Sequence, residues 1–153
     1  MEKQQVEIQL NINQETKKLI VDHDESLLHT LRKAGYLSVK SGCDDGTCGV
    51  CTVLVDNKPV RSCKVKTLNL SGTNITTVEA LSQGEHLHPI QEQFIETGAI
   101  QCGFCTPAQI LTAKALLDKN KNPSLVEIRQ AINPVLCRCT GYVRVVQAIQ
   151  RAA

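Results

Sequence analysis

Eight cysteines, spaced as two sets of four, constrain this 153-residue chain more than any other feature of its sequence. The sets are Cys43, Cys48, Cys51 and Cys63, followed by Cys102, Cys105, Cys137 and Cys139. A chain of this length forms one ordinary domain or two small ones, and small domains bury too little surface to be stable without additional cross-links. Cysteines supply such links as disulfides or as metal ligands. Because no cysteine is left over, we expect two sites of four thiolates each.

The cellular compartment decides between disulfides and metal ligands. Residues 1–5 are polar with no apolar signal sequence after them, and no segment approaches the roughly 18 apolar residues of a membrane span. We therefore expect a cytoplasmic protein with no membrane span, in which thiols stay reduced and metal binding is favoured. The net charge is +2 with both signs interspersed, so the sequence predicts no nucleic-acid partner.

The first half of the chain has the pattern of a small sheet. Residues 6–12 alternate between apolar and polar side chains, which indicates a half-buried strand. We predict a second strand at 18–22, a helix over 26–35 that ends at Gly35, and a strand at 51–55 after a cysteine-containing loop. A turn at 56–59 leads to another short strand, and a last strand is predicted at 74–78. This order is typical of a β-grasp sheet crossed by one helix.

The second half changes to helical periodicity. Amphipathic windows at 90–97, 107–119, 124–132 and 142–151 predict a small four-helix bundle. Thr106 is the predicted N-cap of the second helix and Pro107 its first residue. Cys102 and Cys105 would then lie where a helix dipole stabilises thiolates. The predicted fold class is α+β, with a β-grasp ferredoxin-like domain at residues 1–80 and a helical domain at 81–153.

The first cysteine set has a specific spacing. Cys43, Cys48 and Cys51 form the C-x4-C-x2-C pattern of plant-type [2Fe-2S] proteins. Glycines at 42, 46 and 49 allow the backbone to wrap closely around a cluster and to direct N–H groups at its sulfur atoms. A zinc knuckle or unrelated reduced thiols remain the alternatives, although structural zinc sites usually show paired spacing.

The second set is less specific when it is considered alone. Cys102-x2-Cys105 followed by Cys137-x-Cys139 is also compatible with zinc, although a separation of one residue is tight for a tetrahedral zinc site. A structural zinc protein is therefore a further interpretation of the chain. The helical domain is otherwise expected to be a second [2Fe-2S]-binding domain.

Three blocks of sequence, at 42–53, 101–107 and 137–142, resemble the iron-sulfur subunit of the molybdenum hydroxylases, the xanthine dehydrogenase family. The resemblance covers nearly the whole chain and implies an electron-transfer subunit with two [2Fe-2S] clusters. It implies that the cluster nearer a flavin is held by Cys43, Cys48, Cys51 and Cys63. It implies that the cluster nearer a molybdenum-pterin cofactor is held by Cys102, Cys105, Cys137 and Cys139.

The same resemblance implies partners for the chain. A large subunit would hold the molybdenum-pterin cofactor, with Gln101 hydrogen-bonded to the pterin and Cys139 against it, and a medium subunit would bind FAD. Electrons would pass from molybdenum through the second and then the first cluster to FAD or another acceptor. Since the chain has no Gly-x-Gly-x-x-Gly motif and no P-loop lysine, we expect no nucleotide or flavin pocket in it. The resemblance implies that this chain of an oxidoreductase transfers electrons and has no catalytic residue and no substrate chemistry of its own.

The chain departs from the family pattern at two places. Pro134-Val135 stands where Gly-Asn is frequent, and Ala108 stands where glycine is common. We expect these changes to affect packing beside a cluster and not the ligands. The alternative function is that of a freestanding two-cluster, ferredoxin-type electron carrier that docks transiently to reductases.

Overall fold

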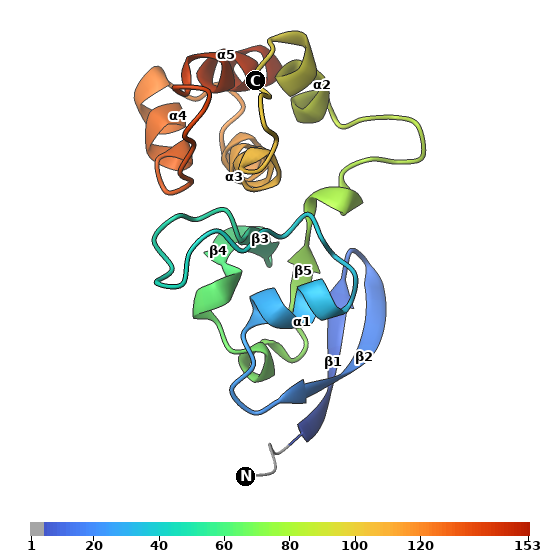
Figure 1. Cartoon of the computed structure of the whole chain (residues 1–153). Helices are drawn as coiled ribbons and strands as arrows, with labels where there is room; N and C mark the ends of the chain where they lie inside the picture. Colours follow the sequence, from blue (N-terminus) through green and yellow to red (C-terminus); the bar gives the residue numbers. More distant parts are fainter. Residues whose placement is uncertain (1–4) are drawn as a thin grey trace.

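A computed structural model describes residues 5–153, which form a sheet domain and a helical domain (Figure 1). Residues 1–4, at the start of the first predicted domain, lie outside the described residues. The mixture of one sheet with a separate group of helices confirms the predicted α+β class. Within residues 5–153, none of the helices combines the length and the apolar character that a membrane-spanning segment requires.

The sheet domain contains five strands. They are β1 (Gln5–Ile12), β2 (Glu15–Asp22), β3 (Thr52–Val55), β4 (Lys58–Arg61) and β5 (Asn74–Thr76). Their order in the sheet is β2-β1-β5-β3-β4, with β1 parallel to β5 and the other neighbours antiparallel. Helix α1 (Leu27–Lys33) crosses one face of this sheet (Figure 1). This is the predicted β-grasp arrangement.

Local sequence explains the strands and their turns. Alternate residues of β1 (Ile8, Leu10 and Ile12) are buried against Leu27 and Leu31 of α1. In the turn between β1 and β2 both central residues have positive φ, and so do both residues of the turn between β3 and β4. Two-residue hairpin turns of this kind match the right-handed twist of the strands. Residues 13–14 and 56–57 therefore fix the register of both hairpins.

The helical domain contains four helices, as predicted. They are α2 (Pro89–Glu96), α3 (Thr106–Lys119), α4 (Leu125–Ile132) and α5 (Val143–Ala152). Their shared core includes Phe94, Leu111, Ile128 and Ile149, which are all fully buried. Apolar residues three and four apart on α2, α4 and α5 contribute to this core, whereas α3 is buried over most of its surface.

Three predicted boundaries were wrong. Strand β2 begins at Glu15 and not at Lys18. Helix α3 begins at Thr106, so Cys105 and not Thr106 occupies the N-cap. The last strand ends at Thr76, and a 3₁₀ helix, η3 (Val78–Ala80), follows it. Two further 3₁₀ helices, η1 (Ser62–Lys64) and η2 (Thr67–Leu70), were not predicted, because single 3₁₀ turns are too short to produce a periodic pattern.

Helix α3 joins the two domains. It packs against strands β3 and β4 on one side (Figure 1) and against α2 and α4 on the other. A third apolar cluster lies at this junction and consists of Cys48, Val50, Cys105, Ala108 and Val135. The two domains are thus in direct contact at the cysteines. The boundary at residues 80/81 remains our proposal; it lies directly after η3.

Candidate metal centres

The structure brings each predicted set of four cysteines together, and within each set the thiols form pairs. All eight cysteines lie in the described residues and are free thiols. In the first set Cys43 pairs with Cys48, and Cys51 pairs with Cys63. In the second set Cys102 and Cys139 lie 3.6 Å apart between their Sγ atoms, and Cys105 pairs with Cys137. The chain therefore presents four thiol pairs in two groups.

Paired thiols distinguish a two-iron site from a zinc site. Two sulfur ligands of one tetrahedral metal lie roughly 3.7 Å apart when the metal–sulfur bonds are about 2.3 Å long. A structural zinc ion needs four such donors around a single point, whereas each iron of a [2Fe-2S] cluster takes two thiolates and shares two sulfides with the other iron. Within residues 5–153, no three cysteine, histidine or acidic side chains are arranged to hold one ion. Four thiols in two adjacent pairs at each site are the donor set that a [2Fe-2S] cluster requires.

A glycine-containing loop surrounds the first site. Gly46 and Gly49 have φ values of 79° and 70°, which side-chain-bearing residues rarely adopt. The backbone N–H of Cys48 donates to Sγ of Cys43 at 3.5 Å, and this hydrogen bond lowers the pKa of the Cys43 thiol. A Cβ atom at Gly42 would lie 3.3 Å from Sγ of Cys48. The loop thus wraps the thiols closely and supplies a donor to sulfur, as the sequence predicted.

Two other thiols of the first site, those of Cys48 and Cys63, are harder to ionise. Burial raises the pKa of Cys48 and raises that of Cys63 to about 11, and the neighbouring cysteines add to both shifts. Ligands must lose their protons when metal binds, so a cation has to compensate for this cost. Two ferric ions at the centre of the group would supply that compensation.

The second site lies between helix ends. Cys102 and Cys105 precede α3, and Cys137 and Cys139 lie between α4 and α5. Burial, together with the adjacent Cys137, raises the pKa of Cys105 to about 12. Burial also raises the pKa of Cys137, but the hydroxyl and amide of Thr140, at 3.1 and 3.4 Å from Sγ, more than offset it and the net shift is downward.

The sequence pattern does not predict the hydrogen bonds that hold this second loop. The hydroxyl of Tyr142 accepts from the Cys137 amide at 2.7 Å and donates to the Val135 carbonyl at 3.2 Å. Thr140 provides the hydrogen bonds to sulfur described above. A hydroxyl residue three positions after a ligand is a recognisable local signal, but the contact of Tyr142 depends on the folded loop.

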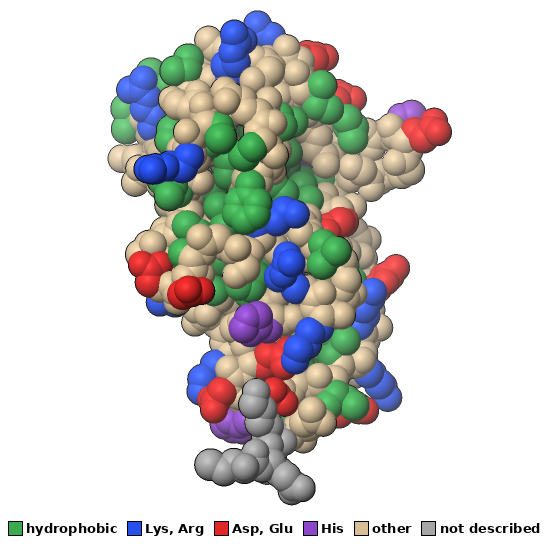
Figure 2. All heavy atoms as spheres, viewed as in Figure 1, with side chains coloured by type: hydrophobic (Ala, Val, Ile, Leu, Met, Phe, Trp, Pro, Cys, Tyr) green, Lys and Arg blue, Asp and Glu red, His purple; other side chains and the backbone are tan. Residues whose placement is uncertain are grey.

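The two exposed cysteines both belong to the second site. Cys48, Cys51 and Cys105 are buried, whereas Cys102 and Cys139 are exposed. Exposed apolar side chains adjoin the second site in sequence, namely Ile100, Phe104, Leu136 and Val143. Figure 2 shows apolar side chains gathered over the helical domain and its junction with the sheet. The second site therefore opens onto an apolar part of the surface.

Gln101 also lies at this surface. It lines a cavity of about 290 Å³ together with Gly98, Thr140, Val143, Arg144 and Gln147. Since Thr140 follows Cys139 directly, the two predicted cofactor contacts, Gln101 and Cys139, lie at one edge of the molecule. Arg144 is fixed there because its guanidinium donates to the Thr97 carbonyl at 3.0 Å.

Comparisons with known proteins agree with this division. Residues 10–82 match a family described as the 2Fe-2S iron-sulfur cluster binding domain, and residues 77–150 match one described as the [2Fe-2S] binding domain. The two matches together cover almost the whole chain and place one domain of [2Fe-2S] type on each set of cysteines.

Three relatives are informative. The chain is 42% identical to the nicotinate dehydrogenase small FeS subunit of Eubacterium barkeri, over 96% of this chain and 94% of that protein. The structure of quinoline 2-oxidoreductase from Pseudomonas putida 86 matches with a TM-score of 0.93 and 40% identity, covering 96% of this chain and 91% of that one. Aldehyde oxidoreductase from Desulfovibrio gigas matches with a TM-score of 0.91 and 40% identity, covering 96% of this chain but 17% of that larger one.

Proposed function

Because the chain belongs to the iron-sulfur subunits of the molybdenum hydroxylases, we propose that its two sets of thiols hold the two [2Fe-2S] clusters of such an enzyme. The first set, Cys43, Cys48, Cys51 and Cys63, would hold one cluster, and Cys102, Cys105, Cys137 and Cys139 the other. The observation that carries this assignment is the arrangement of the thiols in four pairs, two pairs to a site.

When bound, each cluster would accept and release one electron at a time. The protein residues around it supply the ligands, limit water and stabilise the added negative charge. At the first site this stabilisation comes from backbone amides such as that of Cys48, and at the second from Thr140 and the start of α3. Because the surroundings differ, we expect two distinguishable reduction potentials.

We propose that the second site faces a large subunit that holds the molybdenum-pterin cofactor. Cys139 would lie against this cofactor, and the Gln101 amide would hydrogen-bond its pterin. The exposure of Cys102 and Cys139 and the adjacent cavity support this orientation. The exposed apolar side chains around the site also favour a permanent partner over a freestanding carrier, since large exposed apolar patches usually mark interaction surfaces.

The first site would then pass electrons to a medium subunit that binds FAD, or to another acceptor. The loop that carries Cys43 has three exposed residues, Asp44, Asp45 and Thr47. An acceptor bound to this loop would receive electrons from the first cluster. We propose a cytoplasmic location, because free thiols used as metal ligands are typical of a reducing compartment.

Single substitutions of one ligand in each site test the assignment. Cys43→Ser should remove the first cluster and spare most of the second, and Cys102→Ser should do the reverse. In each variant, iron content should fall from about four to about two per chain and one of two [2Fe-2S] EPR signals should disappear. Thr47→Ser, in the same loop as Cys43 but without a thiol, is the matched control and should keep both signals. Retention of both signals in either cysteine variant would contradict the assignment.

A further inference from the structure

The loop between the first two thiols has two cations against its backbone. Nη1 of Arg61 donates to the Gly46 carbonyl at 2.9 Å. The side chain of Lys64 lies against Cα of the same residue, since a Cβ atom at Gly46 would lie 1.9 Å from Cε and 2.9 Å from Nζ of Lys64. Gly46 lies between Cys43 and Cys48 in the sequence, so both cations belong to the surroundings of the first site.

Gly46 brings Lys64 close to the thiols. The amide of Gly46 contributes a hydrogen bond to the Cys43 thiol, and the Cα atom bonded to this amide is the one that Lys64 covers. Any residue with a Cβ atom at position 46 would occupy the space of the lysine. Lys64 also follows the fourth thiol of the site, Cys63, directly in the sequence. Its ammonium is therefore placed between the two ends of the first set of cysteines.

Among residues 5–153, no carboxylate pairs with Lys64. The lysine is exposed, and within this part of the chain its ammonium forms no hydrogen bond and no ion pair with an acidic residue. Arg61 differs, because its guanidinium binds the carbonyls of both Gly46 and Pro134. Replacing Arg61 would disturb the packing of two loops, whereas replacing Lys64 changes mainly the charge beside the site.

Two carboxylates in the same loop act against this cation. Asp44 and Asp45 are both exposed. The Asp45 carboxylate accepts from the amide and the hydroxyl of Thr47 at 3.0 and 2.7 Å, so it is held within its own turn. The charge of Lys64 therefore remains available to the thiols.

A fixed cation acts on such a site with a definite sign. Four thiolates, two sulfides and two ferric ions sum to a charge of about −2, which becomes about −3 when one electron is added. A neighbouring cation attracts the more negative state more strongly. It therefore raises the reduction potential, and its removal lowers the potential.

We propose that Lys64 is a potential-determining residue, whose ammonium raises the reduction potential of the first site more than that of the second. The proposal rests on the function proposed above. In the reduction that is measured, dithionite supplies one electron and one Fe(III) at the first site becomes Fe(II), with no bond formed or broken at the protein. A raised potential suits the first site to accept electrons from the second.

The test is a graded change of charge at position 64 in the full-length chain with both clusters. Lys64→Arg keeps the charge, Lys64→Gln removes it and Lys64→Glu reverses it. Lys58→Gln is the matched control, because Lys58 is exposed beside the turn between β3 and β4 and carries an equal charge. Iron content confirms that both clusters are present, and a redox titration followed by EPR measures the potential of each cluster separately.

We expect Lys64→Gln to lower the ratio of reduced to oxidised first cluster about three- to tenfold at a fixed ambient potential, where tenfold corresponds to about 59 mV for one electron. Lys64→Glu should lower this ratio by about the square of that factor, because Coulomb energy is proportional to charge. Lys64→Arg and Lys58→Gln should match the wild type. The shift should shrink in about 1 M salt, since salt screens an exposed charge.

Three results would overturn the proposal. One is an unchanged potential of the first cluster in both Lys64→Gln and Lys64→Glu. Another is a shift of equal size in both clusters or in Lys58→Gln. A third is an equal shift in Lys64→Arg, which would show that the shape of the lysine and not its charge is responsible. Wild-type protein without two clusters would instead refute the proposed function itself.

Discussion

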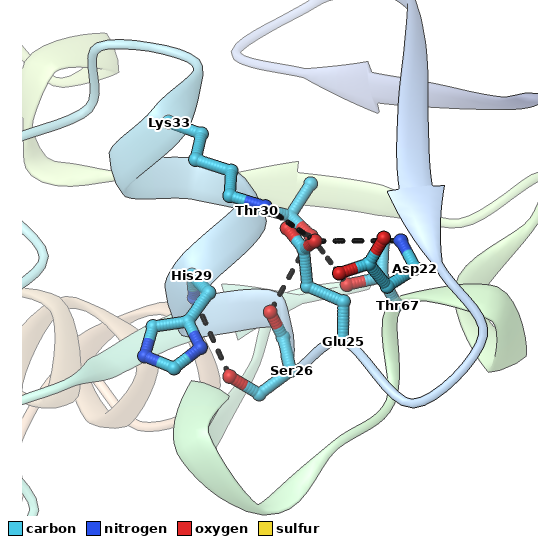
Figure 3. A network of polar contacts seen from close by, with 7 residues as sticks. All are labelled: Asp22, Glu25, Ser26, His29, Thr30, Lys33 and Thr67. Atoms are coloured by element: carbon cyan, nitrogen blue, oxygen red, sulfur yellow. Dashed lines mark hydrogen bonds and ion pairs between the residues drawn. The ribbon is translucent and has the colours of Figure 1, made fainter. Parts of the chain in front are cut away.

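Glu25 shows how a single buried charge supports the first metal site. Its side chain is 4% exposed, and it accepts from the Asp22 amide at 3.4 Å, the Thr30 hydroxyl at 3.0 Å and the Lys33 ammonium at 2.6 Å (Figure 3). The Thr30 hydroxyl in turn lies 2.7 Å from that of Thr67. A buried carboxylate with several donors is stable in the folded protein.

This network fixes the chain segment that follows Cys63. The Thr67 amide donates to the Glu25 carbonyl at 2.9 Å, and the Leu27 amide donates to the Val65 carbonyl at 2.9 Å. Residues 65–67 are thereby held to the start of α1. The last thiol of the first site, only two residues before Val65, is positioned by these contacts.

We predict that Glu25→Gln weakens the fold in a pH-dependent manner. Burial raises the pKa of Glu25, but the hydrogen bonds from Lys33, Asp22 and Thr30 outweigh it and hold the pKa below its ordinary value of 4.5. A lowered pKa means that the carboxylate stabilises the folded state above pH 4.5 and that this contribution is lost as the pH falls through the folded pKa. Replacing the carboxylate should cost about 1 to 3 kcal/mol at neutral pH.

The measurement is urea unfolding of the wild type and the variant between pH 7 and pH 4. The difference in unfolding free energy should shrink toward acid pH, and any acid lability of the clusters common to both proteins cancels in this difference. Glu85→Gln, in an exposed loop, is the control and should change little. A difference that stays constant with pH would show that the Glu25 charge is not what stabilises the network.

Local spacing explains which site residues the sequence could identify. Cys43, Cys48 and Cys51 lie in one loop, so their separation along the chain fixes their separation in space. The contacts of Arg61 with Pro134, and of Tyr142 with Val135, depend on the folded junction and loop. No pattern in the sequence places residues 61 and 134 together, so this part of the site required the structure.

Helix α3 packs against both domains and also positions Cys105 at its N-terminus. It starts directly after Cys105 and is covered by the sheet on one side and by other helices on the other. Buried residues therefore surround the helix instead of forming one apolar stripe. The sequence predicted a helix here correctly, but the expectation of a single apolar face was wrong. Its N-cap was misplaced by one residue because Thr106-Pro107 resembles the usual start of a helix.

We predict that Gln109→Met in α3 stabilises the protein. Gln109 is fully buried, and neither atom of its amide has a hydrogen-bond partner in the part of the chain that the structure describes. Methionine has a similar volume and no such polar group. The substitution should raise the unfolding free energy by about 1 to 3 kcal/mol, the usual cost of an unpaired buried polar group.

Thermal unfolding of the protein with its clusters measures this effect. Gln130→Met, at an exposed position of α4, is the control and should leave the midpoint nearly unchanged. A lower midpoint for Gln109→Met would contradict the prediction that the unpaired amide destabilises the fold.

The whole molecule consists of two small domains that are joined at their metal sites. The sequence predicted the sheet and the bundle because each depends on periodic patterns within its own segment. It did not predict the junction, because Gly49 and Pro134 meet only when the two domains are packed together. At this junction Ala108 and Val135 are buried as apolar packing residues beside Cys48 and Cys105, which agrees with the expectation that they affect packing and not the ligands.

Metal analysis of the whole chain tests the central claim most directly. Iron, sulfide and zinc should be measured on anaerobically purified protein, and EPR spectra should be recorded after reduction with dithionite. We predict about four irons per chain and two different [2Fe-2S] signals, because the eight thiols form two groups of two pairs. About one or two zinc ions per chain with no EPR signal would contradict the account and would make the protein a structural zinc module.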